Sequence, residues 1–318
     1  MPQGLISSNW GGTIIESWSD NATNARCAGA GAAASVELPA GVDGPERFGA
    51  TAGPTPNTGF GVLFNAMIHP FTVGPTSLKS IIWFQGESNA NNATRYACTQ
   101  PAMIASWRDY FKNPAAFFGF VELEPWLGMG PSLAAFRTAQ LAALRLPNVG
   151  YAIATDIGDP LGPFGSVHPR NKKVVGARLA AAALSIAYGE PRAWAPPTYR
   201  RATASAAGAA LTVTVEFDNV PTALVAAADR CKTEPPFNVS AAACAWFSIT
   251  GSDGAELNAT AAVDARAPAA LVLTATARAA GVTAVGTAFG MNAWPVNTIL
   301  SREGLPLQPW RESVAAAQ

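Results

Sequence analysis

The sequence has no excess of charge of either sign. Its 21 lysines and arginines balance 21 aspartates and glutamates, and no basic stripe runs along its 318 residues. Because a nucleic-acid backbone is held by concentrated positive charge, this balance argues against a nucleic-acid partner. We expect instead a small-molecule or glycan substrate that is recognised without strong charge steering.

Long hydrophobic runs are also missing. No stretch approaches the ~20 consecutive apolar residues that span a bilayer, so we expect no membrane partner. A secretory leader is not evident either, because Met1-Pro2-Gln3 leads directly into Gly4-Leu5-Ile6 without a basic start or a small-residue cleavage site.

Histidine and cysteine are scarce. The two histidines, His69 and His168, are isolated and form no ligand cluster, so we expect no metal and no organic cofactor. The four cysteines lack the CxxC spacing of zinc or redox sites, and they are either buried thiols or disulfides. We favour two disulfides, which pair Cys27 with Cys98 and Cys231 with Cys244.

Four segments fit the short N-glycosylation pattern, although chance matches to it are common. They begin at Asn21, Asn92, Asn238 and Asn258. Together with disulfides, they indicate a secreted protein or one of a lysosomal or extracellular lumen. A secreted type of chain without a leader is a first sign of a missing N-terminal part.

The composition supports a folded core, since 49% of residues are hydrophobic and 13% are charged. The first two-thirds alternate short apolar runs with helical periodicity, which is typical of an α/β fold with a parallel sheet. We predict strands at 3–9, 80–84, 117–122 and 149–154 and helices at 103–111, 133–144 and 171–188. Residues 28–60 read as a long irregular excursion.

A domain boundary is predicted near Pro196-Pro197, because beyond it the hydrophobic residues recur at every second position. Further strands are expected at 211–217, 244–250, 270–277 and 282–289. The expected domains are therefore an α/β domain at 1–195 and a small antiparallel β domain at 196–318.

His168 is the first candidate for catalysis, because it follows the last strand of the α/β pattern and precedes the last helix. Reactive groups in open α/β sheets gather beyond the carboxyl ends of strands, where a histidine can relay a proton for a hydroxyl nucleophile. The alternative is a surface or helix-capping histidine. His69 is better explained as a structural histidine in a loop.

Two glycine turns follow predicted strands and are candidates for binding a developing oxyanion. Gln85-Gly86-Glu87 offers a side-chain amide and backbone N–H groups, and Gly11 and Gly12 allow backbone to approach a ligand closely. Each signal is weak by itself, since tight turns need glycine for other reasons.

Ile82-Trp83-Phe84-Gln85-Gly86-Glu87-Ser88-Asn89 is similar to the I-W-Y-Q-G-E-S-N block of the sialate O-acetylesterases. Four other segments are similar to the same family and occur in family order. They lie at 4–13, 65–70, 101–108 and 165–172, and the segment 290–295 is like the β-rich end of the animal-type members.

The resemblance implies an SGNH-like hydrolase with a doubly wound, flavodoxin-like parallel sheet. It implies that His168 is the general base, that Gln85 with Gly11 or Gly12 stabilises the oxyanion, and that O-acetyl groups are removed from a sugar, sialic acid above all.

The chain departs from the family in two places. The family's nucleophilic serine stands in a Gly-Gln-Ser-Asn-Met-like turn after the first strand, and it has no counterpart here. We therefore expect this chain to be part of a longer esterase, with the first strand missing from the chain. The aspartate usual before the histidine is replaced by Gly165 and Ser166, and Asp156 or Asp159 is the alternative partner.

Ser88, Ser7 and Ser8 are poor substitutes for the nucleophile, because none stands in a strand-to-helix elbow. Two readings compete with the incomplete sialate esterase. One is a glycan-binding protein that has lost catalysis, and the other is an esterase for a different acetylated polysaccharide such as xylan.

Overall fold

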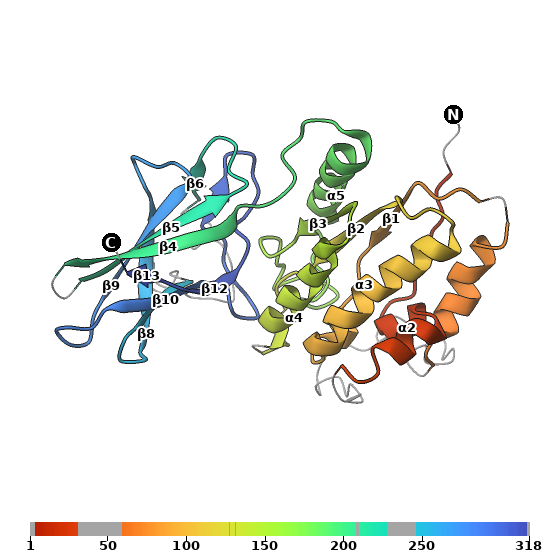
Figure 1. Ribbon diagram of the computed structural model, residues 1–318, viewed down its shortest axis with the longest axis horizontal. Helices are drawn as coiled ribbons and strands as arrows, with labels where there is room; N and C mark the ends of the chain where they lie inside the picture. The colour runs from red at the N-terminus through yellow and green to blue at the C-terminus, as the bar shows by residue number, and fades with distance from the viewer. Residues whose placement is uncertain are drawn as a thin grey trace. The chain divides into compact units, whose positions relative to one another are not determined.

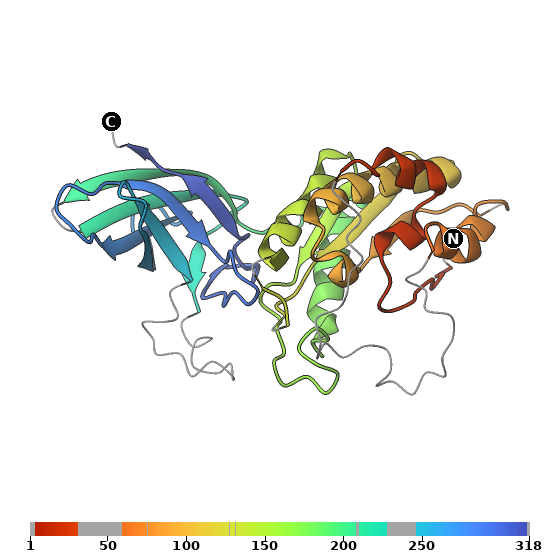
Figure 2. The same ribbon diagram turned by 90° about the horizontal axis from the view of Figure 1, so that it is seen from below.

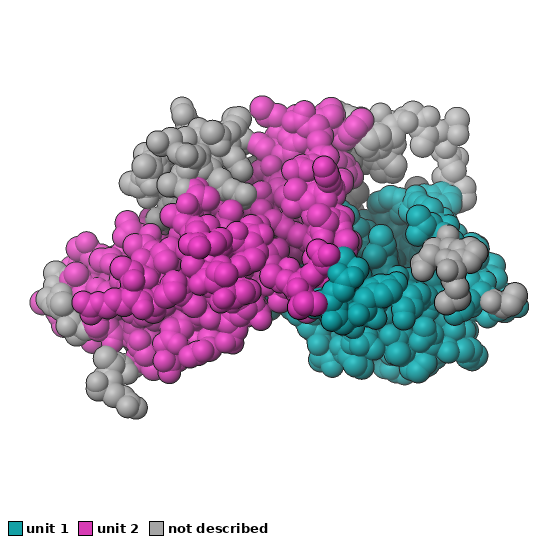
Figure 3. Space-filling model, turned by 90° about the horizontal axis from the view of Figure 1, so that it is seen from above, with its two compact units in different colours: residues 1–123, 135–151, 183–190 teal, residues 124–134, 152–182, 191–318 magenta. Residues whose placement is uncertain are grey.

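The computed structural model describes residues 4–30, 59–74, 76–126, 128–130, 132–207, 210–227 and 246–316. The chain forms two compact units that interleave along the sequence (Figure 3). Unit 1 contains residues 1–123, 135–151 and 183–190, and unit 2 contains residues 124–134, 152–182 and 191–318. The expected domains at 1–195 and 196–318 stay a prediction.

A three-stranded sheet of order β1-β2-β3 occupies the first part of the chain (Figure 1). Its strands are β1 (Ser80–Trp83), β2 (Phe117–Glu122) and β3 (Val149–Ile153), which confirms three of the four strands expected there. β1 pairs with β2 in parallel. All of β2 and β3 is buried, as parallel strands usually are, whereas Ile82 on β1 is 70% exposed at the edge of the sheet.

The fourth expected strand, at 3–9, is wrong. Residues 4–10 form no strand, and Leu5 is fully exposed and Ile6 half-exposed. An apolar run becomes a strand only when a neighbour pairs with its backbone, and no described strand pairs with this one. The Ser8 hydroxyl instead donates to Met67 O at 2.8 Å.

Three long helices confirm the helical periodicity of the sequence. They are α3 (Ala93–Tyr110), α4 (Ser132–Gln140), which continues as the 3-10 helix Leu141–Arg145, and α5 (Lys172–Tyr188). α3 tolerates Pro101 in its interior. Proline has no N–H for the carbonyl four residues earlier, and Arg145 Nη2 donates to that carbonyl, Ala97 O, at 3.3 Å.

Short helices surround α3. They are α1 (Ile15–Trp18), α2 (Asn21–Arg26), the π-helix Phe64–Ile68 and the 3-10 helices His69–Phe71 and Glu87–Asn89. A disulfide joins Cys27, at the end of α2, to Cys98 on α3, which confirms the first expected pairing. The second pair, Cys231 and Cys244, lies outside the described residues, as do Asn238 and most of the irregular segment 28–60.

The C-terminal part is antiparallel, as expected, with one parallel pairing at its last strand. Eight strands form a sheet of order β12-β10-β7-β8-β9-β5-β4-β13, and β6 (Leu224–Ala226) pairs with β11 (Ile299–Ser301). The eight are β4 (Thr198–Ala207), β5 (Ala210–Asp218), β7 (Phe247–Gly251), β8 (Glu256–Val263), β9 (Ala270–Thr276), β10 (Ala284–Phe289), β12 (Trp310–Ser313) and β13 (Ala315–Ala316). The long strands β4 and β5 run side by side (Figures 1 and 2).

Alternation along β5 builds the core of this sheet. Leu211, Val213, Val215 and Phe217 are buried, and the residues between them are partly exposed. Phe217 packs against Trp310 with a ring-centroid distance of 5.3 Å. The period of two in the sequence is therefore the inward and outward alternation of a half-buried antiparallel strand.

Candidate active site

The Gly11-Gly12 turn in unit 1 is exposed, and neither glycine N–H donates to another described residue. Thr13 Oγ1 donates to Trp10 O at 2.8 Å and closes the turn, and Trp18 Nε1 donates to the same hydroxyl at 2.8 Å. Gly12 has a φ of 71°, which favours glycine. A Cβ on either glycine would meet no atom within 4 Å. Because neither N–H has a partner among the described residues, both amides are candidates to donate to a ligand.

The Gln85 side chain is fully engaged in holding this turn. Its Nε2 donates to Thr13 O at 2.9 Å and to Asn89 Oδ1 at 2.8 Å, which uses both amide hydrogens. Its Oε1 accepts from the Tyr96 hydroxyl at 3.1 Å. Gln85 is buried, so these bonds are protected from water. The Gln85 side chain therefore fixes the position of Thr13, and its amide has no hydrogen left to donate to a ligand.

Asn89 connects Gln85 to a buried ion pair. Its Oδ1 also accepts from Ile15 N at 2.9 Å, and its Nδ2 donates to Glu16 Oε2 at 2.9 Å. Glu16 Oε1 in turn lies 2.9 Å from Arg95 Nε, and both side chains are about 95% buried. Removing one member would leave a buried charge or amide without its partner, so the network ties the Gly11-Gly12 turn rigidly to α3.

His168 lies in unit 2 at the end of a tightly coiled segment. Three turns follow one another at every third residue: Gly162 N donates to Asp159 O, Gly165 N to Gly162 O and His168 N to Gly165 O, each at 3.1 Å. A Cβ on Gly162 would lie 3.1–3.3 Å from three backbone oxygens of this segment. His168 itself is exposed.

Each of the two candidate aspartates is bound by its own arginine. Arg178 Nη1 and Nη2 donate to the two oxygens of Asp156 at 2.6 and 2.8 Å, and this pair is buried. Arg170 Nε and Nη2 donate to the two oxygens of Asp159 at 2.6 and 2.9 Å, nearer the surface. The hydrogen bond from Arg170 lowers the pKa of Asp159 below its ordinary value. Asp159 is therefore a fixed anion at neutral pH.

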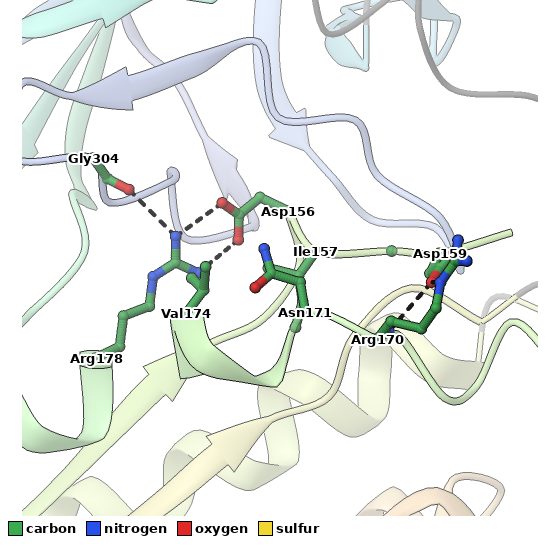
Figure 4. Close-up of a pocket in the computed structure, with 9 residues that line it drawn as sticks. Asp156, Ile157, Asp159, Arg170, Asn171, Val174, Arg178 and Gly304 are labelled. Atoms are coloured by element: carbon green, nitrogen blue, oxygen red, sulfur yellow. Dashed lines mark hydrogen bonds and ion pairs between the residues drawn. The ribbon is translucent and has the colours of Figure 1, made fainter. Parts of the chain in front are cut away.

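Both ion pairs line one pocket of about 510 Å³ in unit 2 (Figure 4). The pocket lies between the segment after β3 and the first turns of α5, and Gly304 closes one side. Figure 4 shows the Asn171 side chain between the Asp156–Arg178 pair and the Asp159–Arg170 pair. The pocket begins two residues from His168.

The structure therefore sorts the site residues expected from the sequence into two groups. Gly11, Gly12 and Gln85 form one connected group in unit 1, whereas Asp156 and His168 belong to unit 2. Sequence reasoning missed the residues that hold these groups in place. They are Thr13, Glu16, Asn89, Arg95, Arg170 and Arg178. Asn89 and Arg170 stand inside the quoted motifs, but nothing local in the sequence indicates their partners.

Across the part of the chain that the structure describes, no group of three or more His, Cys, Asp or Glu side chains is placed to hold a metal ion. Among those same residues, no helix combines the length and apolar character that crossing a bilayer requires.

Comparisons with known proteins agree on one family. Residues 1–185 match the family model described as carbohydrate esterase, sialic acid-specific acetylesterase. The chain is 36% identical to the sialate O-acetylesterase of Rattus norvegicus over 223 residues, which cover 59% of this chain and 40% of the relative. It is 36% identical to that of Homo sapiens over 206 residues, which cover 59% of this chain and 36% of the relative. It thus spans about two fifths of the length of these curated relatives.

A solved structure is similar as well. The crystal structure of a novel carbohydrate acetylesterase from Xanthomonas citri matches with a TM-score of 0.69 and 29% sequence identity, over 96% of this chain and 60% of that one. The family match covers more than half of the chain and includes both groups of candidate residues. The chain therefore belongs to the carbohydrate esterase family of sialic acid-specific acetylesterases.

Proposed function

We propose that this chain is part of a carbohydrate O-acetylesterase that removes O-acetyl groups from sialic acid. Its α/β portion would be an SGNH-like, doubly wound domain in which β1, β2 and β3 are three strands of a larger parallel sheet. The observation that carries the proposal is the exposed Gly11-Gly12 turn, whose N–H groups donate to no other described residue and whose next residue, Thr13, is held by Gln85.

The chemistry would be acyl transfer through a serine and His168. The imidazole accepts the proton of the serine hydroxyl while the serine oxygen attacks the carbonyl carbon of the acetyl group. The imidazole then returns the proton to the sugar oxygen that leaves. Water next attacks the acetyl-enzyme, the imidazole accepts a proton from that water, and acetate departs as the proton passes back to the serine oxygen.

The tetrahedral oxyanion would be bound by the Gly11 or Gly12 amide with the help of Gln85. Because both Gln85 hydrogens are already used, Gln85 either exchanges one bond for the oxyanion or acts by holding Thr13 in place. Each preorganised donor in such a site is worth about 10²–10³ in kcat.

The orienting acid is assigned to Asp156. Its carboxylate is held in a buried pair with Arg178, and Arg178 also donates to Ile153 O at 2.6 Å, which fixes the guanidinium to the end of β3. Asp159 is the second choice, because three donors of Arg170 surround its carboxylate.

The nucleophile is assigned to a serine other than Ser7, Ser8 or Ser88. Ser88 is buried in the 3-10 helix Glu87–Asn89, and the Ser8 hydroxyl donates to Met67 O. Ser7 and Ser8 follow no described strand, and Ser88, although it follows β1, is buried and does not present a hydroxyl for attack.

We also propose a secreted or lysosomal setting, with the mature protein in an oxidising lumen. The Cys27–Cys98 disulfide supports it, because such bonds persist where thiols are not kept reduced. Asn21 begins α2 with an exposed side chain and could carry a glycan.

The decisive test is acetate release from O-acetylated sialic acid and from p-nitrophenyl acetate. Three proteins are compared: this chain, a chain extended upstream to the length of its relatives, and the extended chain with His168→Ala. His69→Ala in the extended chain is the matched control. We expect turnover only with His168 intact, and a loss of about 10²–10⁴-fold in His168→Ala.

Other outcomes separate the alternatives. Turnover by the 318-residue chain alone would contradict the assignment of the nucleophile and direct mutation to Ser88, Ser7 and Ser8. Saturable sugar binding without turnover in any chain would favour a glycan-binding protein. Faster release from acetylated xylan than from acetylated sialic acid would favour a plant or microbial polysaccharide as substrate.

A further inference from the structure

The pocket beside the His168 segment offers a neutral set of polar groups. Its charged lining consists of Asp156, Asp159, Arg170 and Arg178, and each carboxylate is paired with one guanidinium. At about 510 Å³ it falls within the ~300–1,000 Å³ usual for small-molecule sites. A ligand entering it meets fixed hydrogen-bonding groups but no uncompensated charge.

Arg178 has no Nη hydrogen left for a ligand. Its Nη1 donates to Ile153 O and Asp156 Oδ1, and its Nη2 donates to Asp156 Oδ2 and Gly304 O. Since each Nη carries two hydrogens, these four bonds use them all. An anionic group would therefore find no free cation at the buried end of the pocket and would face the Asp156 carboxylate.

Donors and acceptors remain free at the centre and at the outer end. Among the described residues, the Asn171 side chain makes no hydrogen bond and Arg170 Nη1 has no acceptor, although both residues line the pocket. Figure 4 shows Asn171 between the two ion pairs. Its amide offers a donor and an acceptor side by side, which matches a pair of adjacent hydroxyls on a sugar ring.

Apolar contact is available on the same walls. Ile157 and Val174 line the pocket, from the segment after β3 and from the first turn of α5. A sugar ring carries C–H groups between its hydroxyls, so it fits a pocket that combines such side chains with a few convergent polar groups.

We propose that this pocket is a subsite for one uncharged sugar unit of the acetylated glycan, held by Asn171 and Arg170. The inference rests on the proposed function, since a bound sugar unit would lie near His168. Arg170 follows His168 by two residues, which span at most about 7 Å of chain. The sialic acid itself, with its carboxylate, is excluded from this subsite, and the pocket takes its neutral neighbour.

The test is saturation-transfer NMR on this 318-residue chain with methyl galactoside, xylotriose and N-acetylneuraminic acid as probes. We expect one or both neutral sugars to bind and N-acetylneuraminic acid not to displace them. Asn171→Ala should weaken neutral-sugar binding about tenfold, the change expected from losing one or two hydrogen bonds. Asn258→Ala, an exposed asparagine on β8, is the matched control and should bind as the parent chain does.

A second variant, Val174→Trp, fills the pocket from α5 and should abolish binding, with folding checked by circular dichroism. The proposal is overturned if a folded chain binds no neutral sugar, if Asn171→Ala binds as well as the parent, or if N-acetylneuraminic acid competes equally. If neutral sugars bind in a way that depends on Asn171 but no longer chain releases acetate, the subsite is supported and the esterase function is rejected. If a longer chain releases acetate but no binding depends on Asn171, the esterase function is supported and the subsite is rejected.

Discussion

An ion pair between Asp159 and Arg170, eleven residues apart in the chain, joins the two ends of the segment that carries His168. Arg170 Nε donates to Asp159 Oδ2 at 2.6 Å and Nη2 donates to Oδ1 at 2.9 Å, while the backbone N–H of Arg170 donates to Oδ2 at 3.2 Å. Between these two residues, three successive turns end at His168 N. The backbone of His168 is therefore held from both directions.

Asp159→Asn should loosen this segment without unfolding the protein, because the pair lies near the surface and exposed pairs add little global stability. We expect the amide hydrogens of Gly162, Gly165 and His168 to exchange faster with solvent. Hydrogen exchange followed by mass spectrometry measures this. Glu256→Gln, which breaks the exposed Arg311–Glu256 pair, is the control and should leave the segment unchanged. Unaltered exchange in Asp159→Asn would show that the turns alone hold the segment.

The same pair makes the segment sensitive to acid. The hydrogen bond from Arg170 lowers the pKa of Asp159 below its ordinary value of 3.8. A lowered pKa in the folded state stabilises the fold fully above pH 3.8, and that stabilisation is lost as the pH falls through the folded value. Exchange at Gly162 and Gly165 should therefore gain an additional acceleration below about pH 4, and Asp159→Asn should lack it. Identical pH profiles for the two proteins would contradict this.

Asn89→Ala should be strongly destabilising. The change removes the acceptor of Gln85 Nε2 and Ile15 N and the donor to Glu16, and it leaves all three groups buried. Each unsatisfied buried group costs about 1–3 kcal/mol, so we expect the free energy of unfolding to fall by about 2–4 kcal/mol. Urea denaturation measures this, with Asn258→Ala as an exposed control within about 0.5 kcal/mol of the parent. A loss under about 1 kcal/mol would mean that water replaces the amide.

The two glycines of the candidate oxyanion turn should respond differently to alanine. Gly12 has a φ of 71°, where a Cβ is strained by about 1–2 kcal/mol, although no neighbouring atom blocks it. Gly11 has no such φ and equally open surroundings, so Gly11→Ala should change stability by less than about 0.5 kcal/mol. Thermal melts of the two variants make the comparison. Equal melting temperatures would contradict a left-handed Gly12.

Reduction of the Cys27–Cys98 disulfide should lower stability markedly. The bond closes a loop with a sequence separation of 71, and chain entropy for such a loop corresponds to about 4 kcal/mol. We expect a clear fall in melting temperature with reductant, and a similar fall in a Cys27→Ala, Cys98→Ala double variant. The double variant should respond less to reductant than the parent does. A parent chain indifferent to reductant would argue that packing of α2 on α3 suffices.

Local patterns in the sequence determined the three long helices and several of the strands. The largely apolar runs at 117–122 and 149–153 are the buried strands β2 and β3, and the alternation of Leu211, Val213, Val215 and Phe217 is β5 with one face inward. Such patterns are reliable because burial repeats with the period of the backbone itself. They did not identify β4 or β8, although both strands pair with neighbours on two sides.

The tertiary structure decided which segments pair as strands and which polar side chains become hydrogen-bond partners, neither of which a local pattern specifies. The run at 3–9 has a strand-like composition but no pairing neighbour in the described structure, and its described residues, 4–9, form no strand and are largely exposed. Gln85 stood in a recognisable motif, yet its partner Thr13 lies 72 residues away, and Asp156 meets Arg178 across 22 residues. A hydrogen-bond partner is chosen by proximity in the folded chain, because any buried polar group must find one, and the order of residues does not say which.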